Sequence, residues 1–433
     1  MKKYLNTISA FQFFQLLRYS TLILIGIVFT KTTLTQTAIG EYETFVFIAG
    51  VVSFFWLNGL LKALLPLSSE TENTGQKTIF SAFVVIQIFS VLAALLLYFL
   101  QPFFSGFLLN DKAIPEINLL LLFVVVGVPA NLVEYYYLIK KQNKAILIYG
   151  LLSFFVQFVL VVLPVLFGYG IQLALKGLVL SSLLKYVWLS IVFITKREIS
   201  FSKDFVKEHL NLGGPLIAAT LLSGSAQFVD GFIVTSKFDE ETFAVFRYGA
   251  RELPLAMLLA NALSSAMLPA FANKENLHEN LRQLKKSVSK LMQILFPITA
   301  VLLIVSKPVF PVLFNPDFTE SATIFNIYLL LVISRLLMPQ TILNGLKISK
   351  PILSASFLEL VLNVVLSLVF VQFWGIAGIA MATFIAYLFE KIYLVVLVRR
   401  KLNIQLSEYL SIRNYTLYSF GIIVIFIFTE LIF

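Results

Sequence analysis

The chain has 433 residues, of which 59% are hydrophobic and 13% charged, whereas soluble domains carry about 25% charged residues. With 43 phenylalanines and a mean hydropathy of +0.91, this composition predicts an all-α polytopic membrane protein and excludes a soluble globular one. The absence of cysteine excludes disulfides and thiolate–metal sites, and with two histidines we expect neither a metal site nor a cofactor. The net charge of +10 comes from basic residues in loops between apolar segments, a pattern of membrane topology and not of nucleic-acid binding.

The first apolar segment covers approximately residues 8–30 and contains Arg18. It is too long for the apolar core of a signal peptide and lacks a small-residue cleavage site, so we expect an uncleaved membrane span. Further spans are expected in two groups and a final run: 42–66, 79–101, 117–139, 145–168 and 171–195; then 212–236, 242–271, 287–306, 320–345, 352–373 and 375–398; and last 414–432. The sequence therefore predicts about 13 transmembrane helices.

Basic residues separate the loops into two sets. If the N-terminus is cytoplasmic, the inside loops hold most of the lysines and arginines, and the outside loops hold four lysines, mostly beside acids: Lys31, Lys112, Lys237 and Lys307. This asymmetry follows the positive-inside rule and places the C-terminus outside.

An internal repeat joins the two groups of six spans at an offset of 201–206 residues. Leu65-Pro66 corresponds to Leu268-Pro269, and Gly170-Ile171 corresponds to Gly375-Ile376. Ile39–Phe45 likewise corresponds to Phe243–Gly249, and Lys140–Ala145 to Leu346–Pro351. Because each unit has an even number of spans, the repeats are parallel, and such bundles enclose a central cavity that opens alternately to each side.

The expected organisation is therefore a six-helix lobe over residues 1–200, a second over 201–400 and an additional transmembrane helix over 401–433. Within the second lobe, the polar segment 272–290 keeps its apolar residues at helical spacing and its basic residues on the other face. This pattern predicts an amphipathic helix at the cytoplasmic interface.

An Arg in the first span, the Gly40-Glu41-Tyr42 turn and a hairpin ending in Leu-Pro together resemble the O-antigen-type polysaccharide flippases of the multidrug/oligosaccharidyl-lipid/polysaccharide exporter superfamily. The two six-helix lobes and Phe246-Arg247-Tyr248 extend this resemblance over residues 1–400. The resemblance implies flipping of an undecaprenyl-pyrophosphate-linked oligosaccharide from the cytoplasmic to the periplasmic leaflet. The extra C-terminal run departs from the usual twelve spans of these flippases.

Arg18 lies about 15 Å into its span, close to the bilayer midplane. A guanidinium at that depth must face a watery cavity or an acidic partner, and in such a flippase it would be a suitable planar donor to pyrophosphate. A structural arginine that holds helices together is the alternative.

The two apolar runs of the hairpin Leu212–Phe271 hold four more charges: Asp230, Arg247, Arg251 and Glu252. Arg247 and Arg251 are four residues apart and share one helix face. On an unbroken hairpin Asp230 and Arg251 lie at similar depth, so the arginines are expected either to bind the anionic headgroup or to pair with Asp230. Pro254 is expected to interrupt the eighth span.

Arg335 and Glu359 lie deep in the second lobe, where they are expected to form an ion pair or, for Glu359, a proton-coupling site. Lys185 and Gln157 offer polar groups in the first lobe. Three charges near cytoplasmic helix ends are expected to extend toward the headgroups: Lys62, Glu134 and Glu390.

The sequence thus predicts a non-enzymatic flippase of the bacterial inner membrane that works by alternating access on a lipid-linked oligosaccharide, among membrane lipids, with proton or sodium coupling. A multidrug exporter of the same fold is the first alternative, although its cavity should be acidic. An integral-membrane enzyme of envelope polysaccharide synthesis is the second, although the sequence shows no catalytic constellation.

Overall fold

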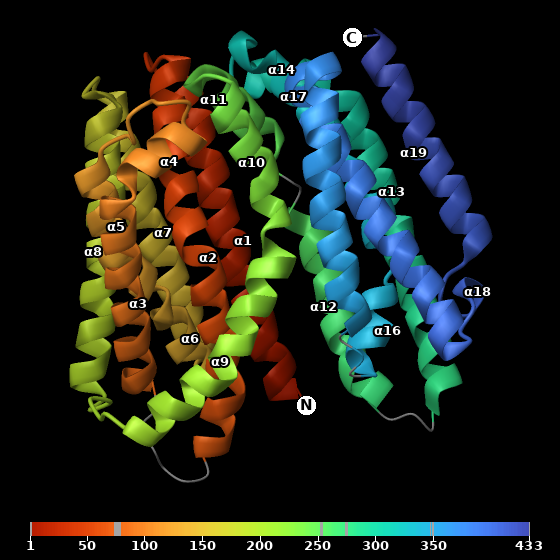
Figure 1. The fold of residues 1–433 in the computed structure, drawn as a ribbon, viewed down its shortest axis with the longest axis horizontal. Coiled ribbons are helices and arrows are strands. Elements are labelled where there is room, and N and C mark those ends of the chain that lie inside the picture. The colour runs from red at the N-terminus through yellow and green to blue at the C-terminus, as the bar shows by residue number, and fades with distance from the viewer. Residues whose placement is uncertain are drawn as a thin grey trace. The chain divides into compact units, whose positions relative to one another are not determined.

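The structure is a computed structural model that describes residues 2–72, 79–251, 254–272, 276–346, 348 and 350–432. These residues form helices and no strand, which confirms the predicted all-α membrane fold (Figure 1). Contacts divide the chain into two compact units. Unit 1 consists of Met1–Phe228 and Thr235–Ala244, and unit 2 consists of Val229–Val234 and Val245–Phe433.

Unit 1 is built from eight helices of the first repeat and one that follows them. They are α1 (Lys2–Thr30), α2 (Gln36–Glu72), α3 (Ile79–Phe99), α4 (Gln101–Leu108), α5 (Ile117–Ala130), α6 (Leu132–Ile139), α7 (Asn143–Leu166), α8 (Gly170–Thr195) and α9 (Lys203–Gly224). Helix α1 packs on α7, α7 on α8, α8 on α5, α5 on α3, and α2 on α9. The apolar side chains buried between these helices form one hydrophobic cluster within the unit.

Unit 2 takes its helices from the second half of the chain. They are α12 (Pro254–Ala272), α13 (Leu277–Leu313), α14 (Thr319–Leu329), α15 (Leu331–Arg335), α16 (Pro339–Gly345), α17 (Lys350–Leu402), α18 (Leu406–Tyr409) and α19 (Ile412–Ile432), with a 3₁₀ turn at Pro316–Phe318. Helix α13 packs on α14 and α19, and α16 packs on α12 and α17. A second hydrophobic cluster fills this unit.

Two helices belong partly to each unit: α10 (Ala226–Lys237) and α11 (Glu240–Gly249). The turn between them is capped by Asp239, whose carboxylate accepts a hydrogen bond of 2.8 Å from the backbone N–H of Thr242. This is the ordinary N-cap of a helix start.

A glycine with a positive φ angle lies at corresponding positions of the two repeats. Gly170 has φ +76° and opens α8, and Gly375 has φ +54° within α17. Residues with a Cβ atom rarely adopt this conformation, so glycine is required at both bends. The bend at Gly375 divides α17 where the sequence separates two spans.

Ten helices among the described residues are long and apolar enough to cross a membrane, and α17 counts once among them despite its bend. The predicted count of about 13 is consistent with this set, because the two interrupted helix pairs α9–α10 and α11–α12 cover the seventh and eighth predicted spans. Helix α9 begins at Lys203, earlier than predicted, because Ser202 caps it by accepting from the N–H of Phe205 at 3.2 Å. The described part of segment 272–290 continues without a break into the span of α13.

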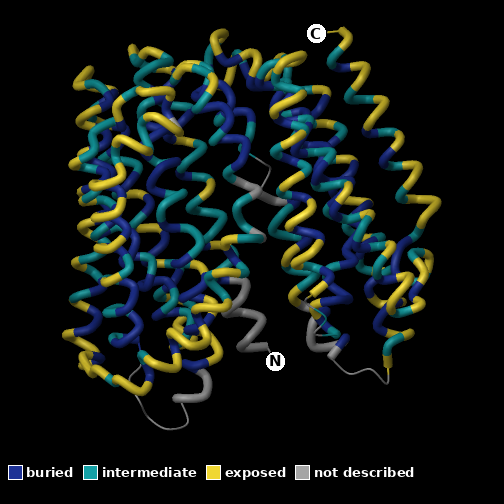
Figure 2. The backbone as a smooth tube through the Cα atoms, viewed as in Figure 1, coloured by how far each residue is buried: buried dark blue, intermediate teal, exposed yellow. Residues whose placement is uncertain are grey.

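Exposed residues occur along the length of these helices (Figure 2), and many of them are large and apolar. Phe155 on α7 and Phe428 on α19 are 67% and 65% exposed. In water such surfaces would drive aggregation, but in a bilayer they face lipid. The exposed apolar residues therefore agree with a multi-pass membrane protein.

Candidate functional site

A proline break between α5 and α6 shapes the first wall of a pocket in unit 1. Pro129 has no N–H and cannot bond the carbonyl of Val125 four residues earlier. That carbonyl instead accepts a 3.1 Å hydrogen bond from Nε2 of Gln87 on α3. The helix then stops at Asn131, whose amide donates to the carbonyls of residues 127 and 128 at 3.3 and 3.0 Å. Its Oδ1 is thereby left to accept from the pocket.

The second wall forms where α7 and α8 approach closely. A Cβ atom added to Gly177 would lie 2.0 Å from the carbonyl oxygen of Leu160, so only glycine fits there. The carbonyl oxygen of Leu160 lacks its usual hydrogen bond within α7, because Pro164, four residues later, has no N–H. Eight residues after Gly177, Lys185 lies on the same face of α8. Its Nζ donates to Oε1 of Gln157 on α7 at 2.7 Å.

The third wall is α1, where Phe14 and Arg18 are one turn apart. Phe14 is fully buried, 5.1 Å from the ring of Phe154 between ring centroids. The Arg18 guanidinium lies 5.2 Å from the centroid of Phe14 and 5.9 Å from that of Phe154. Such cation–π contacts favour a cation whose hydration is reduced.

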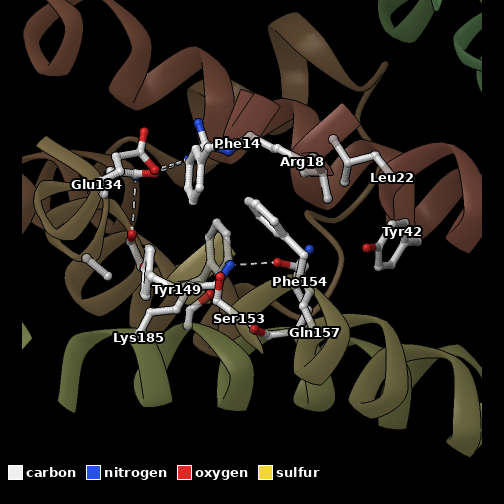
Figure 3. Close-up of a pocket in the computed structure, with 17 residues that line it drawn as sticks. Phe14, Arg18, Leu22, Tyr42, Glu134, Tyr149, Ser153, Phe154, Gln157 and Lys185 are labelled. Carbon is white, nitrogen blue, oxygen red and sulfur yellow. Dashed lines mark hydrogen bonds and ion pairs between the residues drawn. The ribbon is translucent and has the colours of Figure 1, made fainter. Parts of the chain in front are cut away.

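Glu134 of α6 is the counter-ion of Arg18 (Figure 3). Its side chain is 3% exposed and accepts a hydrogen bond from Nη2 of Arg18, which also lies 3.4 Å from Oδ1 of Asn131. The expectation that Glu134 extends to the headgroups is therefore wrong. The break at Asn131 turns α6 so that this carboxylate faces the interior of the unit.

The pocket enclosed by these walls has a volume of about 140 Å³. At about 30 Å³ per water molecule it holds four to five waters, enough for a phosphate-sized group but not for an oligosaccharide. Its lining combines two cations with one carboxylate and several neutral polar side chains: Arg18, Lys185, Glu134, Asn131, Ser153, Gln157, Ser182 and Tyr42. Since the cations outnumber the carboxylate, the pocket suits an anion.

A cluster of oxygen atoms surrounds Asp230 in unit 2. Its carboxylate is 4% exposed and accepts from the Tyr328 hydroxyl of α14 and from Oγ1 of Thr383 on α17, at 2.6 and 2.7 Å from its two oxygens. Oδ1 of Asn363 lies 3.4 Å from the same Thr383 hydroxyl and accepts from Ser367 at 3.0 Å. The hydroxyls of Tyr328, Thr383 and Ser367 thus supply one hydrogen for each of the three acceptor oxygens of Asp230 and Asn363.

The predicted arginine partner of Asp230 is not its partner in the structure, which gives it neutral hydroxyls instead. The depth argument assumed one straight helix over residues 242–271. As predicted from Pro254, that helix is interrupted: α11 ends at Gly249 and α12 begins at Pro254. Arg251 lies in this interruption, half-buried, with its guanidinium 4.6 Å from the ring centroid of Tyr248.

The other predicted site residues are distributed between the units. Arg247 is half-buried on α11 in unit 2, whereas Arg18 lies in unit 1, so a joint site of Arg18, Arg247 and Arg251 stays a prediction. Glu252 lies outside the described residues. A site in unit 1 can be described without them.

Arg335 and Glu359 take different surroundings within unit 2. Arg335 lines a small polar pocket with Gln340 and Lys391. Glu359 is 4% exposed, and its electrostatic neighbours are Glu390, Lys391 and Asp230. Glu390, expected at the headgroups, is buried at 4% exposure and bonded to Lys391 at 2.6 Å, so that expectation is also wrong.

Known proteins resemble this chain in sequence and in fold. The family model described as "Polysaccharide biosynthesis protein" matches residues 33–323, more than half of the chain. The chain belongs to this family. No curated protein matches it in sequence.

Among solved structures, "Lipid II flippase MurJ, inward closed conformation" matches this polysaccharide biosynthesis protein with a TM-score of 0.72 and 18% identity, over 98% of this chain and 93% of the other. "Crystal structure of MATE in the straight conformation" matches with a TM-score of 0.63 and 15% identity, over 93% and 96%. A third match is "Inward-facing conformation of a multidrug resistance MATE family transporter of the MOP superfamily", with a TM-score of 0.63 and 15% identity, over 88% and 94%. At these identities the likeness establishes the fold.

The chain therefore belongs to a polysaccharide biosynthesis family and shares the fold of a lipid II flippase and of MATE transporters, in line with the fold that the resemblance implied. The residue that sequence reasoning missed in its pocket is Glu134. Pro129, five residues earlier, is the signal that could have indicated Glu134. After a break in a helix, side chains point in other directions than they would on an unbroken helix.

Proposed function

We propose that the protein flips an undecaprenyl-pyrophosphate-linked oligosaccharide from the cytoplasmic to the periplasmic leaflet of the bacterial inner membrane, for surface polysaccharide synthesis. The polypeptide does this without covalent chemistry, by alternating access between two lobes. The N-terminus is cytoplasmic in this proposal, as the distribution of basic residues favours.

The observation that carries the proposal is the pocket around Arg18 in unit 1. An Arg and a Lys at membrane depth are costly unless they serve an anion or a counter-ion, and Glu134 can neutralise only one of them. A volume of about 140 Å³ admits the pyrophosphate but not the sugars. The isoprenoid tail then remains in the hydrocarbon of the bilayer.

Glu134 has a defined part in this mechanism. In the present conformation its carboxylate binds the Arg18 guanidinium, in the position that a phosphate oxygen of the substrate would take. The headgroup displaces the carboxylate when it binds, and the carboxylate competes for Arg18 when the headgroup leaves. Such an internal competitor prevents the site from holding its substrate too tightly to release it.

A multidrug exporter of cations is the main rival on this fold. Its cavity would need an acid free to meet the drug, whereas the pocket carboxylate of unit 1 is engaged by Arg18. The balance of charge therefore favours an anionic substrate. An integral-membrane enzyme is disfavoured because the matching folds are those of transporters.

The Asp230 cluster supports a coupling ion in unit 2. Carboxylate, amide and hydroxyl oxygens are the ligands that hard cations prefer, and the cluster gathers all three kinds around a buried carboxylate. Asp230, Asn363 and Thr383 would hold Na⁺, or Asp230 would take up a proton. Either Na⁺ or a proton would neutralise the buried carboxylate of Asp230, which is costly to keep charged without a counter-ion.

Reconstitution in vesicles with a labelled lipid-pyrophosphate oligosaccharide tests the substrate. We expect Arg18→Gln to reduce translocation about tenfold or more and Arg18→Lys to retain part of it, because lysine keeps the charge but loses the planar donor pair. Lys307→Gln is the control, since it removes a half-buried lysine that is paired with Glu430 outside the pocket. Unchanged translocation in Arg18→Gln would refute the headgroup role.

Ion gradients test the coupling proposal in the same vesicles. Wild-type translocation should rise with an imposed sodium or proton gradient, and Asp230→Asn should lose this stimulation. Thr383→Val keeps the carboxylate and should weaken a sodium effect more than a proton effect, because it removes an oxygen ligand. Full stimulation of Asp230→Asn by both gradients would contradict the assignment.

A further inference from the structure

Helix α13 of unit 2 carries a row of basic side chains near its N-terminal end (Figure 1). Arg282, Lys286 and Lys290 are spaced four residues apart, so they share one face of the helix, and all three are exposed. We call these three residues the basic row. Within the described part of the chain none of them has an ion pair, and the acid nearest to them along the helix is Glu279.

The opposite face of α13 fixes the direction of the basic row. Leu281, Leu284 and Val288 are fully buried and belong to the hydrophobic cluster of unit 2. Lys285, beside them, donates to the backbone carbonyl of Ser407 at 2.7 Å and so ties α13 to α18. These contacts hold the helix against rotation about its axis, and the basic row therefore points away from the interior of the unit.

The basic row begins where the apolar part of α13 ends. Residues 291–313 contain a single charged side chain, Lys307, and at about 1.5 Å per residue they are long enough to cross about 30 Å of hydrocarbon. Along the helix axis Lys290, Lys286 and Arg282 lie about 2, 8 and 14 Å beyond this segment. The headgroup layer is about 5–8 Å thick on each side, and long basic side chains extend several ångströms to reach it. All three cations are therefore within reach of the phosphates of one leaflet.

The neighbouring helix ends add more positive than negative charge. Among the described residues of α13, α18 and the adjoining ends of α17 and α19, the carboxylates at this end are Glu279 and Glu408. Glu408 is already engaged, 3.4 Å from Nδ1 of His278 and 2.7 Å from the backbone N–H of Gln405. Four further cations are exposed there: Arg399, Arg400, Lys401 and Arg413. This end of unit 2 is therefore positive even after both carboxylates are counted.

The positive-inside rule explains the sign of these charges but not their arrangement. On α9 in unit 1, Lys203 and Lys207 are also exposed and one turn apart, but an exposed acid follows each of them directly, Asp204 and Glu208. The charges of α9 thus balance within one turn, whereas those of the basic row do not. Like charges at a spacing of four residues repel each other along a helix, so an anionic partner would stabilise the basic row.

We infer that the basic row of α13 binds the headgroups of anionic lipids, such as phosphatidylglycerol, in the leaflet that it faces. The partner is a lipid because the row is an open helix face at headgroup depth. Lysine and arginine donate charge-assisted hydrogen bonds to phosphate oxygens, and neighbouring lipids can share the row. This inference does not depend on the substrate proposed above.

Native mass spectrometry of the full chain tests the inference, after release from phosphatidylcholine nanodiscs with increasing phosphatidylglycerol. Wild type should retain phosphatidylglycerol in preference to phosphatidylcholine. Each basic residue beside an anionic leaflet strengthens binding about fivefold. The triple variant Arg282→Gln, Lys286→Gln, Lys290→Gln should therefore need about tenfold more phosphatidylglycerol, or more, for the same retention. A second triple variant, Arg282→Lys, Lys286→Arg, Lys290→Arg, keeps the charges and should retain the lipid as wild type does.

The matched control is the triple variant Lys144→Gln, Lys203→Gln, Lys207→Gln. It removes three exposed lysines of unit 1 on the side expected to be cytoplasmic, with the same change in net charge, and it should retain the lipid as wild type does. Equal losses in the two glutamine variants would mean that net charge alone attracts the lipid, and they would overturn the inference. A wild type without preference for phosphatidylglycerol, or unchanged retention when the basic row is replaced by glutamine, would overturn it as well. Thermal unfolding of each variant checks that the fold is intact.

Discussion

Replacing Glu134 with glutamine isolates the proposed competition in the Arg18 pocket. Glutamine has nearly the same shape and keeps an acceptor oxygen for Arg18, but it removes the negative charge. With Arg18 and Lys185 counted as cations and Glu134 as an anion, the formal charge of these three residues changes from +1 to +2. The pyrophosphate should then meet a free guanidinium.

The size of the effect follows from the geometry. Two unit charges about 4 Å apart interact by about 4 kcal/mol at an effective dielectric constant of about 20. The Arg18 side chain is 32% exposed, so water screens part of this energy. If about one third of this interaction energy is gained by the headgroup in Glu134→Gln, pyrophosphate binds more strongly by about 1.4 kcal/mol, which is a tenfold change in affinity.

Pyrophosphate titration and single-turnover flipping measure the two consequences. Glu134→Gln should bind about tenfold more tightly and release its substrate more slowly, because changes in affinity appear mainly in the dissociation rate. The double variant Arg18→Gln with Glu134→Gln should lose this gain. Its stability should lie closer to wild type than that of Arg18→Gln alone, which leaves a buried carboxylate without its cation.

Two results would refute the reasoning. If Glu134→Gln binds pyrophosphate no more tightly than wild type, the carboxylate does not compete with the headgroup. If the double variant binds as tightly as Glu134→Gln, Arg18 does not contact the headgroup. Thermal unfolding of each variant shows whether a loss of binding reflects the site or the fold.

Three further predictions concern stability and are measured by thermal unfolding. Gly177→Ala should destabilise the protein by about 1–3 kcal/mol, because its Cβ would meet a backbone oxygen. Gly214→Ala is the control and should be neutral or stabilising, because no atom lies within 4 Å of the added Cβ. Equal effects of the two substitutions would contradict the close approach of α7 and α8. Asp239→Ala should cost about 1 kcal/mol and Asp239→Ser little, because both aspartate and serine cap helices. Hydrogen bonds from Thr242 lower the pKa of Asp239 below its ordinary value, so its contribution is present at neutral pH and should be lost as the pH falls through the lowered pKa; a cap contribution that persists in acid would contradict this.

The membrane class, the spans and the repeat could be predicted from the sequence because they depend on hydropathy along the chain. The same is true of the interruption at Pro254, where the backbone chemistry of one residue decides the geometry. Arg18 was predictable as a cavity residue because no acid in its own span can neutralise it. These features depend on residues close in sequence or on the type of a single residue.

The partners of the buried charges could not be predicted in the same way. Glu134 is 116 positions from Arg18, and Thr383 is 153 positions from Asp230. Depth along a span places such groups at the same level, but it does not give the rotation of each helix about its axis. For Glu134 and Glu390 depth alone suggested an aqueous end, whereas the packed helices turned both carboxylates inward.

The interruptions of the helices connect these observations. Within a bilayer an unbonded backbone carbonyl costs several kcal/mol, so a break requires side chains, water, a neighbouring helix or a local change of helix geometry to satisfy the freed group. Gln87 satisfies the carbonyl that Pro129 leaves, and the same break directs Asn131 and Glu134 into the pocket. A proline in a predicted span followed within about one and a half turns by an acid is therefore a better indicator of a buried site than the acid alone. In this chain it identifies the carboxylate that pairs with Arg18.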